Sequence, residues 1–177
     1  MTSFKFPPVY NYEPFWTIQN HENQRKKQIE LWGNLVLAFM KAINKTEMDV
    51  ITTLDTPLFN NKKLQRRLRK MDAEMIIDNL VATNNAKWLD DQKIRARIIW
   101  RTPEQWGTII YKYIDGIGQN GNVLTFEELI NGDEVKKQPF YKIQPDVFLE
   151  AVLDLQTKGK ARVYQNPTLI ESGVKFI

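Results

Sequence analysis

The side chains that most often perform catalysis or bind transition metals are scarce in this chain. Its single histidine, His21, lies in a polar stretch beside Glu22 and Asn23, and the chain has no cysteine. Histidine nitrogens and cysteine thiolates are the usual ligands of zinc, and the carboxylates here are not spaced to replace them. We therefore expect no metal, no disulfide and no other cofactor, and we interpret His21 as a surface residue or as the residue that caps a helix.

Two other patterns resemble functional sites but have a simpler interpretation. Glycines recur after an expected helix, at Gly116, Gly118 and Gly121, whereas a phosphate-binding loop follows a strand and ends in Gly-Lys-Ser/Thr. Neighbouring acidic residues fall in expected turns, where charges are usually solvated, at Asp90-Asp91 and Asp133-Glu134. No set of convergent titratable groups forms an active site, and we predict that the protein is not an enzyme.

The periodicity of the apolar residues predicts a helix-rich first half. From about residue 22 to residue 43 they recur with the helical period, and a second such pattern covers residues 72–84. Between these helices, Leu64 and Leu68 are four residues apart, and we expect a short helix there. Alternating polar and apolar residues then predict a β-hairpin within residues 86–100. Three helices followed by a hairpin is the order of a winged-helix domain.

The same order recurs in the second half of the chain. Helices are expected from Thr102, from Thr125 and at residues 145–158, and both threonines open a capping box. A closing hairpin follows. We therefore predict a helix-rich α+β fold of two tandem winged-helix domains in an elongated arrangement, residues 21–101 and 102–177, with almost no linker between them.

The positive charge of the chain is concentrated in one segment. The net charge is +4 at pH 7, and six of the basic residues lie within nine positions: Lys62, Lys63, Arg66, Arg67, Arg69 and Lys70. Winged-helix proteins that read DNA use the third helix of the domain for recognition. Here both third helices are acidic, in the first domain through Asp72, Glu74 and Asp78. DNA phosphates would repel them, so a nucleic-acid-binding transcription regulator is the alternative function and not the favoured one.

Residues 1–20 combine prolines with many aromatic residues: Phe4, Phe6, Pro7, Pro8, Tyr10, Tyr12, Pro14, Phe15 and Trp16. Proline opposes helix and biases the preceding residue toward extended or polyproline II geometry. The segment cannot form a core of its own, yet its aromatic surface is too large to leave in water. It either docks on a partner protein, packs on the first domain, or presents Pro-Pro-x-Tyr to a WW domain.

An ordered set of short motifs runs through the whole chain. The set comprises Pro7-Pro8-Val9-Tyr10, Pro14-Phe15-Trp16-Thr17, Pro57-Leu58-Phe59-Asn60-Asn61, Pro103-Glu104-Gln105-Trp106-Gly107, Gly118-Gln119-Asn120 and Gly173-Val174-Lys175-Phe176. In this order the motifs resemble the small winged-helix subunit family of the endosomal sorting complex ESCRT-II. The second proline motif departs from the family pattern, because Glu13 stands where members can carry the first proline.

The resemblance implies a set of partner-binding residues in the N-terminal segment: Pro7, Pro8, Val9, Tyr10, Pro14, Phe15 and Trp16. They would dock the chain to two larger winged-helix subunits of ESCRT-II, with the intact first motif contributing most. Tyr10 is the expected anchor and would enter an apolar pocket of a larger subunit. The substitution Tyr10→Ala is therefore expected to weaken partner binding and to leave the free chain folded.

The resemblance also implies an adaptor function. Two copies of the chain would join the larger subunits, and the second domain would recruit an ESCRT-III subunit for the sorting of ubiquitinated membrane proteins into multivesicular bodies. No apolar run is long enough to span a membrane, and prolines interrupt the N-terminal segment where a secretory signal would be continuous. We expect a cytoplasmic protein that its partners recruit to the endosomal membrane and that binds no nucleic acid.

Overall fold

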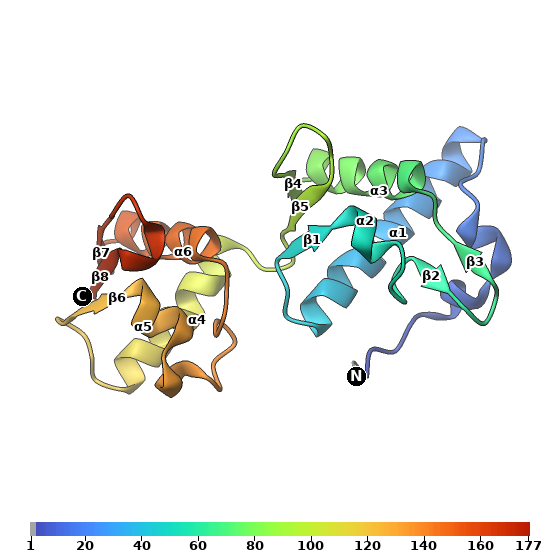
Figure 1. The fold of residues 1–177 in the computed structure, drawn as a ribbon. Helices are drawn as coiled ribbons and strands as arrows, with labels where there is room; N and C mark the ends of the chain where they lie inside the picture. The colour runs from blue at the N-terminus through green and yellow to red at the C-terminus, as the bar shows by residue number, and fades with distance from the viewer. Residues whose placement is uncertain (1–2) are drawn as a thin grey trace. The chain divides into compact units, whose positions relative to one another are not determined.

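The computed structural model describes residues 3–177, which divide into two compact units, residues 3–100 and 101–177 (Figure 1). The first unit contains, in chain order, η1 (Pro8–Asn11), η2 (Glu13–Trp16), α1 (Glu22–Ala42), β1 (Glu47–Asp49), α2 (Val50–Thr53), β2 (Asn60–Asn61), β3 (Arg66–Arg67), α3 (Lys70–Ala82), β4 (Ala86–Trp88) and β5 (Arg95–Ile98). The second unit contains α4 (Pro103–Gly116), β6 (Val123–Thr125), α5 (Phe126–Asn131), η3 (Asp133–Val135), α6 (Pro145–Thr157), β7 (Ala161–Tyr164), η4 (Leu169–Glu171) and β8 (Gly173–Phe176). The η elements are short 3-10 helices.

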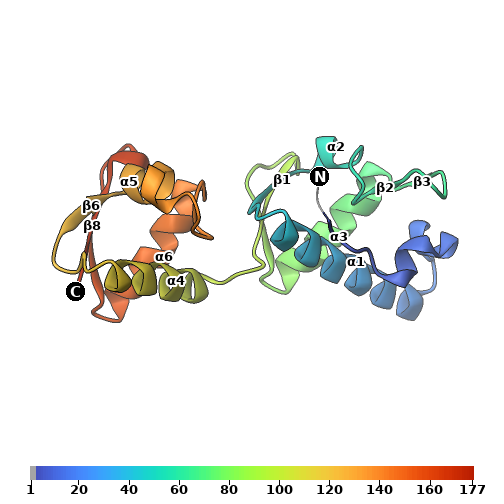
Figure 2. The same ribbon diagram turned by 90° about the horizontal axis from the view of Figure 1, so that it is seen from below.

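Two long helices and a small antiparallel sheet form the core of the first unit. β5 is the central strand and pairs with β1 and with β4. α3 packs against α1 (Figure 2), and a Cβ atom added at Gly33 on α1 would lie 3.1 Å from the Leu80 side chain on α3. Trp32 on α1 is completely buried. The close approach of α1 and α3 therefore depends on the absence of a side chain at Gly33, opposite the large side chain of Leu80.

The basic segment forms a β-hairpin, so the expected short helix is wrong. β2 and β3 pair in antiparallel orientation. The side-chain oxygen of Asn61 accepts a hydrogen bond from the Leu64 amide at 3.1 Å, and Gln65 has a left-handed backbone with a φ of 54°. These two local features turn the chain before a helix can form, because consecutive right-handed residues are required for one. The spacing of Leu64 and Leu68 was thus not a helical repeat, although Leu68 is buried.

The second unit is built in the same way around its own core. α4 packs against α6, and β8 is the central strand between β6 and β7. Both predicted capping boxes are confirmed, because the hydroxyl oxygens of Thr102 and Thr125 each accept a hydrogen bond at 3.2 Å from the amide three residues later, Gln105 and Glu128. Trp106 on α4 is almost completely buried.

Both units contain helix, strand, helix, helix and a closing hairpin in this order, and the first unit adds the β2–β3 hairpin between its second and third helices. The predicted helix-rich α+β class is confirmed, and the order agrees with a winged-helix domain. The second helix of the first unit is α2, however, which was not predicted from the sequence. β1 and β6 were not predicted, because strands of three residues are too short for an alternating pattern to be seen. Within residues 3–177 no helix combines the length and the apolar character that crossing a membrane requires.

Candidate partner-docking site

The N-terminal segment folds into two turns of 3-10 helix, η1 and η2, at the N-terminal end of α1 and beside the β2–β3 hairpin (Figures 1 and 2). The amides of Tyr10 and Phe15 donate to the carbonyl oxygens of Pro7 and Tyr12, both at 3.0 Å. The extended geometry expected here is therefore wrong for residues 8–11 and 13–16, whereas Pro7 and Tyr12 are extended. Proline opposes a helix interior but suits its first turn, where the missing amide hydrogen has no acceptor to lose.

The aromatic side chains of these turns belong to the core of the first unit. Tyr10, Phe15 and Trp16 are only 8%, 3% and 3% exposed. The Phe15 ring stacks on Trp32 with 4.2 Å between the ring centroids, and Trp16 meets the same ring edge to face at 5.0 Å. Packing on the chain's own domain is thus the alternative that the structure supports for these three residues.

Tyr10 is additionally held by hydrogen bonds. Its hydroxyl donates to the carbonyl oxygen of Pro57, and its own carbonyl oxygen accepts from Trp16 Nε1 and Asn61 Nδ2, both at 2.9 Å. Burial raises the pKa of the Tyr10 phenol to about 12. Tyr10 was predicted to anchor the chain in a pocket of a larger subunit, and the burial of its ring in the first unit counts against that role. A WW domain would need the same ring to be exposed, so its burial also counts against that alternative.

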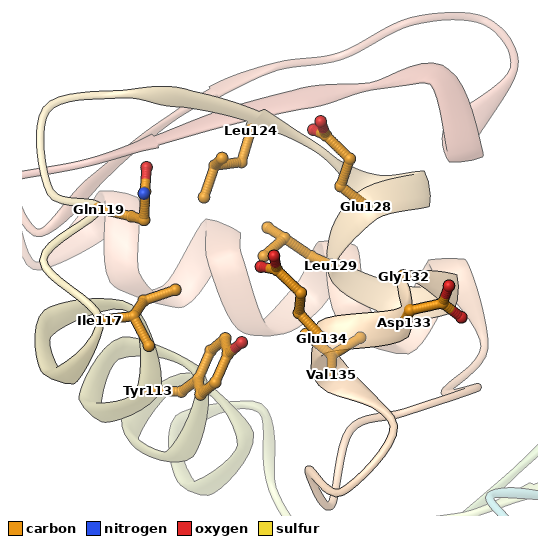
Figure 3. A pocket seen from close by; sticks show the side chains of 10 residues that line it. All are labelled: Tyr113, Ile117, Gln119, Leu124, Glu128, Leu129, Gly132, Asp133, Glu134 and Val135. Atoms are coloured by element: carbon orange, nitrogen blue, oxygen red, sulfur yellow. The ribbon is translucent and has the colours of Figure 1, made fainter.

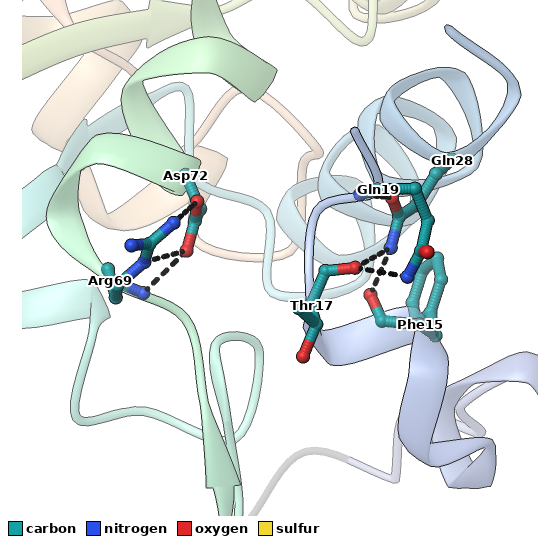
Figure 4. A network of polar contacts seen from close by, with 6 residues as sticks. All are labelled: Phe15, Thr17, Gln19, Gln28, Arg69 and Asp72. Atoms are coloured by element: carbon teal, nitrogen blue, oxygen red, sulfur yellow. Dashed lines mark hydrogen bonds and ion pairs between the residues drawn. The ribbon is translucent and has the colours of Figure 1, made fainter. Parts of the chain in front are cut away.

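Gln28 ties the turns to α1, and its position was not singled out from the sequence (Figure 4). Its side chain is 7% exposed, and its Nε2 lies 3.2, 2.9 and 2.8 Å from the carbonyl oxygens of Pro14, Phe15 and Thr17. Its Oε1 accepts from the Gln19 amide at 2.9 Å. The sequence contains one indication of this role. Gln28 lies one helical turn before Trp32, so it is a polar residue on the buried face of α1.

A shallow groove of about 380 Å³ lies on the outer side of these turns. The docking residues predicted from the sequence contribute Val9, Pro14 and Phe15 to its lining, while Pro8 is exposed and Pro7 half-buried outside it. Tyr12 and Leu31, which were not among the predicted docking residues, add apolar lining and have 61% and 47% of their surfaces exposed. The remaining lining is polar and consists of Gln19, Gln24, Lys27 and Gln28. Leu31 could have been noticed, since it is a large apolar residue outside the buried stripe of α1.

His21 does not act as the cap of a helix, and in residues 3–177 it belongs to no metal-binding group. His21 precedes α1 at the capping position, but it is exposed and its side chain makes no capping hydrogen bond. Across residues 3–177 no group of three or more histidine and carboxylate side chains is placed to hold a metal ion. The candidate binding surface of the first unit is therefore the apolar groove.

The basic segment, residues 62–70, forms ion pairs within its own unit. Arg69 makes two hydrogen bonds of 2.9 Å to the Asp72 carboxylate at the start of α3 (Figure 4). Four of the six basic residues form ion pairs with carboxylates of this unit: Arg66 with Glu13, Arg67 with Asp55, Arg69 with Asp72, and Lys70 with Glu74. Paired cations are less available to phosphates, which agrees with the low weight given to nucleic-acid binding.

Comparison with known proteins assigns the family. The family model described as ESCRT-II complex subunit matches residues 9–144, which is most of the chain. The chain belongs to this family. The matched range begins inside the first proline motif and includes the whole groove, so the candidate site lies in the part of the chain that defines ESCRT-II subunits.

Individual ESCRT-II subunits resemble the chain from end to end. Vacuolar protein-sorting-associated protein 25 of Danio rerio is 37% identical over 175 residues, which cover 98% of this chain and 99% of that protein. The Homo sapiens protein of the same name is 37% identical over 175 residues and 98% of each chain. The fold matches the crystal structure of subunit VPS25 of ESCRT-II with a TM-score of 0.82 at 22% identity, over 99% of both chains. A chain in the crystal structure of ESCRT-II (VPS22/VPS25/VPS36) matches with a TM-score of 0.79 at 23% identity, over 97% of this chain and 98% of that chain.

Proposed function

We propose that this chain is the small adaptor subunit of ESCRT-II, which links the larger subunits to ESCRT-III in the sorting of ubiquitinated membrane proteins into multivesicular bodies. The family match, together with relatives that correspond to the chain end to end, is the observation that supports this most directly. In the related solved complex the other two components are VPS22 and VPS36. Their counterparts are the proposed larger partners.

The proposed function divides the chain into three parts. Residues 1–20 form the docking segment, packed with a first winged-helix domain, residues 21–101. A second winged-helix domain, residues 102–177, receives an ESCRT-III subunit. Two copies of the chain join one copy of each larger subunit, and the complex acts from the cytoplasm on the endosomal membrane, to which this chain is bound through its partners. The role is structural and not enzymatic.

The groove beside η1 and η2 is the proposed docking surface for a larger subunit. Tyr12 and Leu31 supply its exposed apolar area, and Val9 and Pro14 supply rigid walls. The buried aromatic residues Tyr10, Phe15 and Trp16 support these walls from the core side. Pro7 and Pro8 precede the walls in the chain. A surface that is already ordered loses little conformational entropy when a partner binds, so such an apolar rim favours tight binding.

Two substitutions test this docking surface. Tyr12→Ala and Leu31→Ala are each expected to weaken binding to the purified pair of larger subunits about tenfold or more, and to leave thermal unfolding of the free chain nearly unchanged. Met71→Ala is the matched control, because Met71 is 62% exposed on α3 of the same unit and does not line the groove. Equal affinities of the wild type and both groove variants would overturn the docking surface. A wild-type chain that binds neither larger subunit would overturn the proposed function itself.

A further inference from the structure

One face of the second-unit sheet points to solvent. Val174 of the central strand β8 is completely buried, so its neighbours Gly173 and Lys175 lie on the opposite face of the sheet. Leu124 of β6 is directed into a pocket of about 350 Å³ within the second unit (Figure 3), and the same alternation places Val123 on the solvent side. Val123 is 59% exposed, so a large apolar residue of the sheet lies in water.

The register of the strands brings apolar and basic side chains together on this face. Lys175 pairs with Val123 of β6 on one side and with Arg162 of β7 on the other. In the next row Gly173 pairs with Tyr164, which is 46% exposed. A Cβ atom added at Gly173 would lie 3.3 Å from Cγ1 of Val123 and 4.0 Å from Cβ of Tyr164, so these two side chains flank a bare stretch of backbone. Together the five residues form the wing face.

The charges beside the wing face are separated along the strands. Arg162 is exposed, Lys175 is half-buried, and within residues 3–177 neither forms an ion pair. Lys160, which precedes β7, is exposed and adds a third cation at the same end of the sheet. The nearby carboxylates of Glu128 and Glu171 border the other end, since Glu128 follows β6 and Glu171 precedes β8. The end of the sheet that carries Val123 is therefore the positive one.

An anionic lipid bilayer matches this combination of side chains. Each lysine or arginine near such a surface strengthens binding about fivefold. Tyrosine is enriched at the boundary between water and lipid, because its ring is apolar and its hydroxyl is polar. An exposed aliphatic side chain such as Val123 gains free energy when lipid removes it from water. Contacts with nucleic-acid phosphates would use the cations equally well but would not cover Val123.

We propose that the wing face contacts an anionic membrane surface, with Arg162 and Lys175 beside lipid phosphates and with Val123 and Tyr164 at the boundary of the apolar layer. This contact is direct and adds to the one that the partners supply. It rests on the proposed function only for the place where it acts, because a chain held at the endosome by its partners lies near an anionic leaflet. A few cations and two small apolar areas bind weakly alone, so the contact orients the second unit once the partners have brought the complex to the membrane.

The test measures cosedimentation of the full chain with lipid vesicles. One set of vesicles contains phosphatidylcholine alone, and the other contains equal amounts of phosphatidylcholine and phosphatidylserine. The double variant Arg162→Gln/Lys175→Gln removes two charges from the wing face. Lys62→Gln/Lys63→Gln is the matched control, because it removes two charges from exposed residues of the first unit.

The substitution Val123→Thr tests the apolar part of the wing face. Threonine keeps the branched shape that suits a strand and replaces one methyl group by a hydroxyl. Ile51→Thr is its control, because Ile51 is also β-branched and is 43% exposed on α2 of the first unit. Thermal unfolding of each variant without lipid checks that the fold is kept.

The wild type is expected to bind the anionic vesicles at least about tenfold more tightly than the neutral ones. Arg162→Gln/Lys175→Gln should lose about tenfold or more of this affinity and Val123→Thr about threefold, whereas each control should lose less than about twofold. A wild type that ignores anionic lipid, or wing-face variants that bind like the wild type, would overturn the proposal. So would an equal loss for Lys62→Gln/Lys63→Gln, because the positive charge of the whole chain would then attract lipid.

A second titration replaces the vesicles by duplex DNA. If the chain binds DNA through Arg162 and Lys175 and does not bind anionic vesicles, the wing face contacts nucleic acid and the proposal fails. The proposed function is judged separately, by binding of the larger subunits, and it stands whichever of these results is obtained.

Discussion

The substitution Tyr10→Ala should destabilise the first unit. The Tyr10 ring is 8% exposed and stacks on Phe6 with 4.0 Å between ring centroids, and its hydroxyl donates to the carbonyl oxygen of Pro57. Removing a buried aromatic ring costs about 3–5 kcal/mol of folding free energy, since transfer energy is lost and a cavity is left. A domain of this size is stable by only about 5–15 kcal/mol, so a large share of the stability would be lost.

Tyr10→Phe is the matched control for this prediction. It keeps the ring and removes only the hydroxyl, whose acceptor belongs to the exposed residue Pro57 and can bind water instead. The expected loss is about 1 kcal/mol. Comparing the two variants separates the packing of the ring from its hydrogen bond.

Urea unfolding followed by tryptophan fluorescence measures these losses. Four of the five tryptophans lie in the first unit, namely Trp16, Trp32, Trp88 and Trp100, so the signal reports mainly on that unit. We expect the midpoint to fall slightly for Tyr10→Phe and strongly for Tyr10→Ala. A Tyr10→Ala chain that unfolds like the wild type and still loses its partner would refute this reasoning, because the ring would then matter only to the complex.

Three further outcomes follow from contacts in the two units. Burial raises the Tyr10 pKa from 10.0 to about 12. The stabilisation by the neutral phenol is therefore complete below pH 10 and is lost as the pH rises toward 12. Urea titrations across this pH range should show the wild type losing stability relative to Tyr10→Phe. Gln28→Ala should cost about 2–3 kcal/mol in thermal unfolding, since buried carbonyl oxygens lose their donor, whereas Gln24→Ala on the exposed face of α1 should change little. Gly132→Ala should lower the protection of second-unit amides against hydrogen exchange and leave the first unit unchanged, because its Cβ atom would lie 2.3 Å from the Glu128 carbonyl oxygen.

The elements that the sequence predicted best are those whose signals are local. The box that opens α4 needs only Thr102, Pro103 and Gln105, and all three lie within four residues of one another. The hairpin around the basic segment was missed because it depends on a left-handed residue, Gln65, and on the side chain of Asn61, neither of which changes the spacing of the leucines. The four-residue spacing of the two leucines is a coincidence, and the local backbone conformation produces a hairpin instead of a helix.

The candidate site was predicted in part for a different reason. Phe15 and Trp16 were correctly recognised as residues that must be covered, but a large aromatic residue serves equally well in a core and in an interface. Which surface covers it depends on long-range packing, here against Trp32. The 3-10 turns then direct Tyr12 and Pro14 outward and their aromatic neighbours inward, a pattern that an extended chain would not produce.

Because Phe15 and Trp16 pack on Trp32, the proposed docking surface is lost when the first unit unfolds. The same side chains stabilise the fold of the first unit and support the shape of the groove. For any partner that needs the groove, the apparent dissociation constant is the intrinsic one divided by the fraction of chains that are folded. Assembly would thereby select for folded chains. A copy whose first domain is unfolded is left out of the complex, and no separate quality-control signal is required.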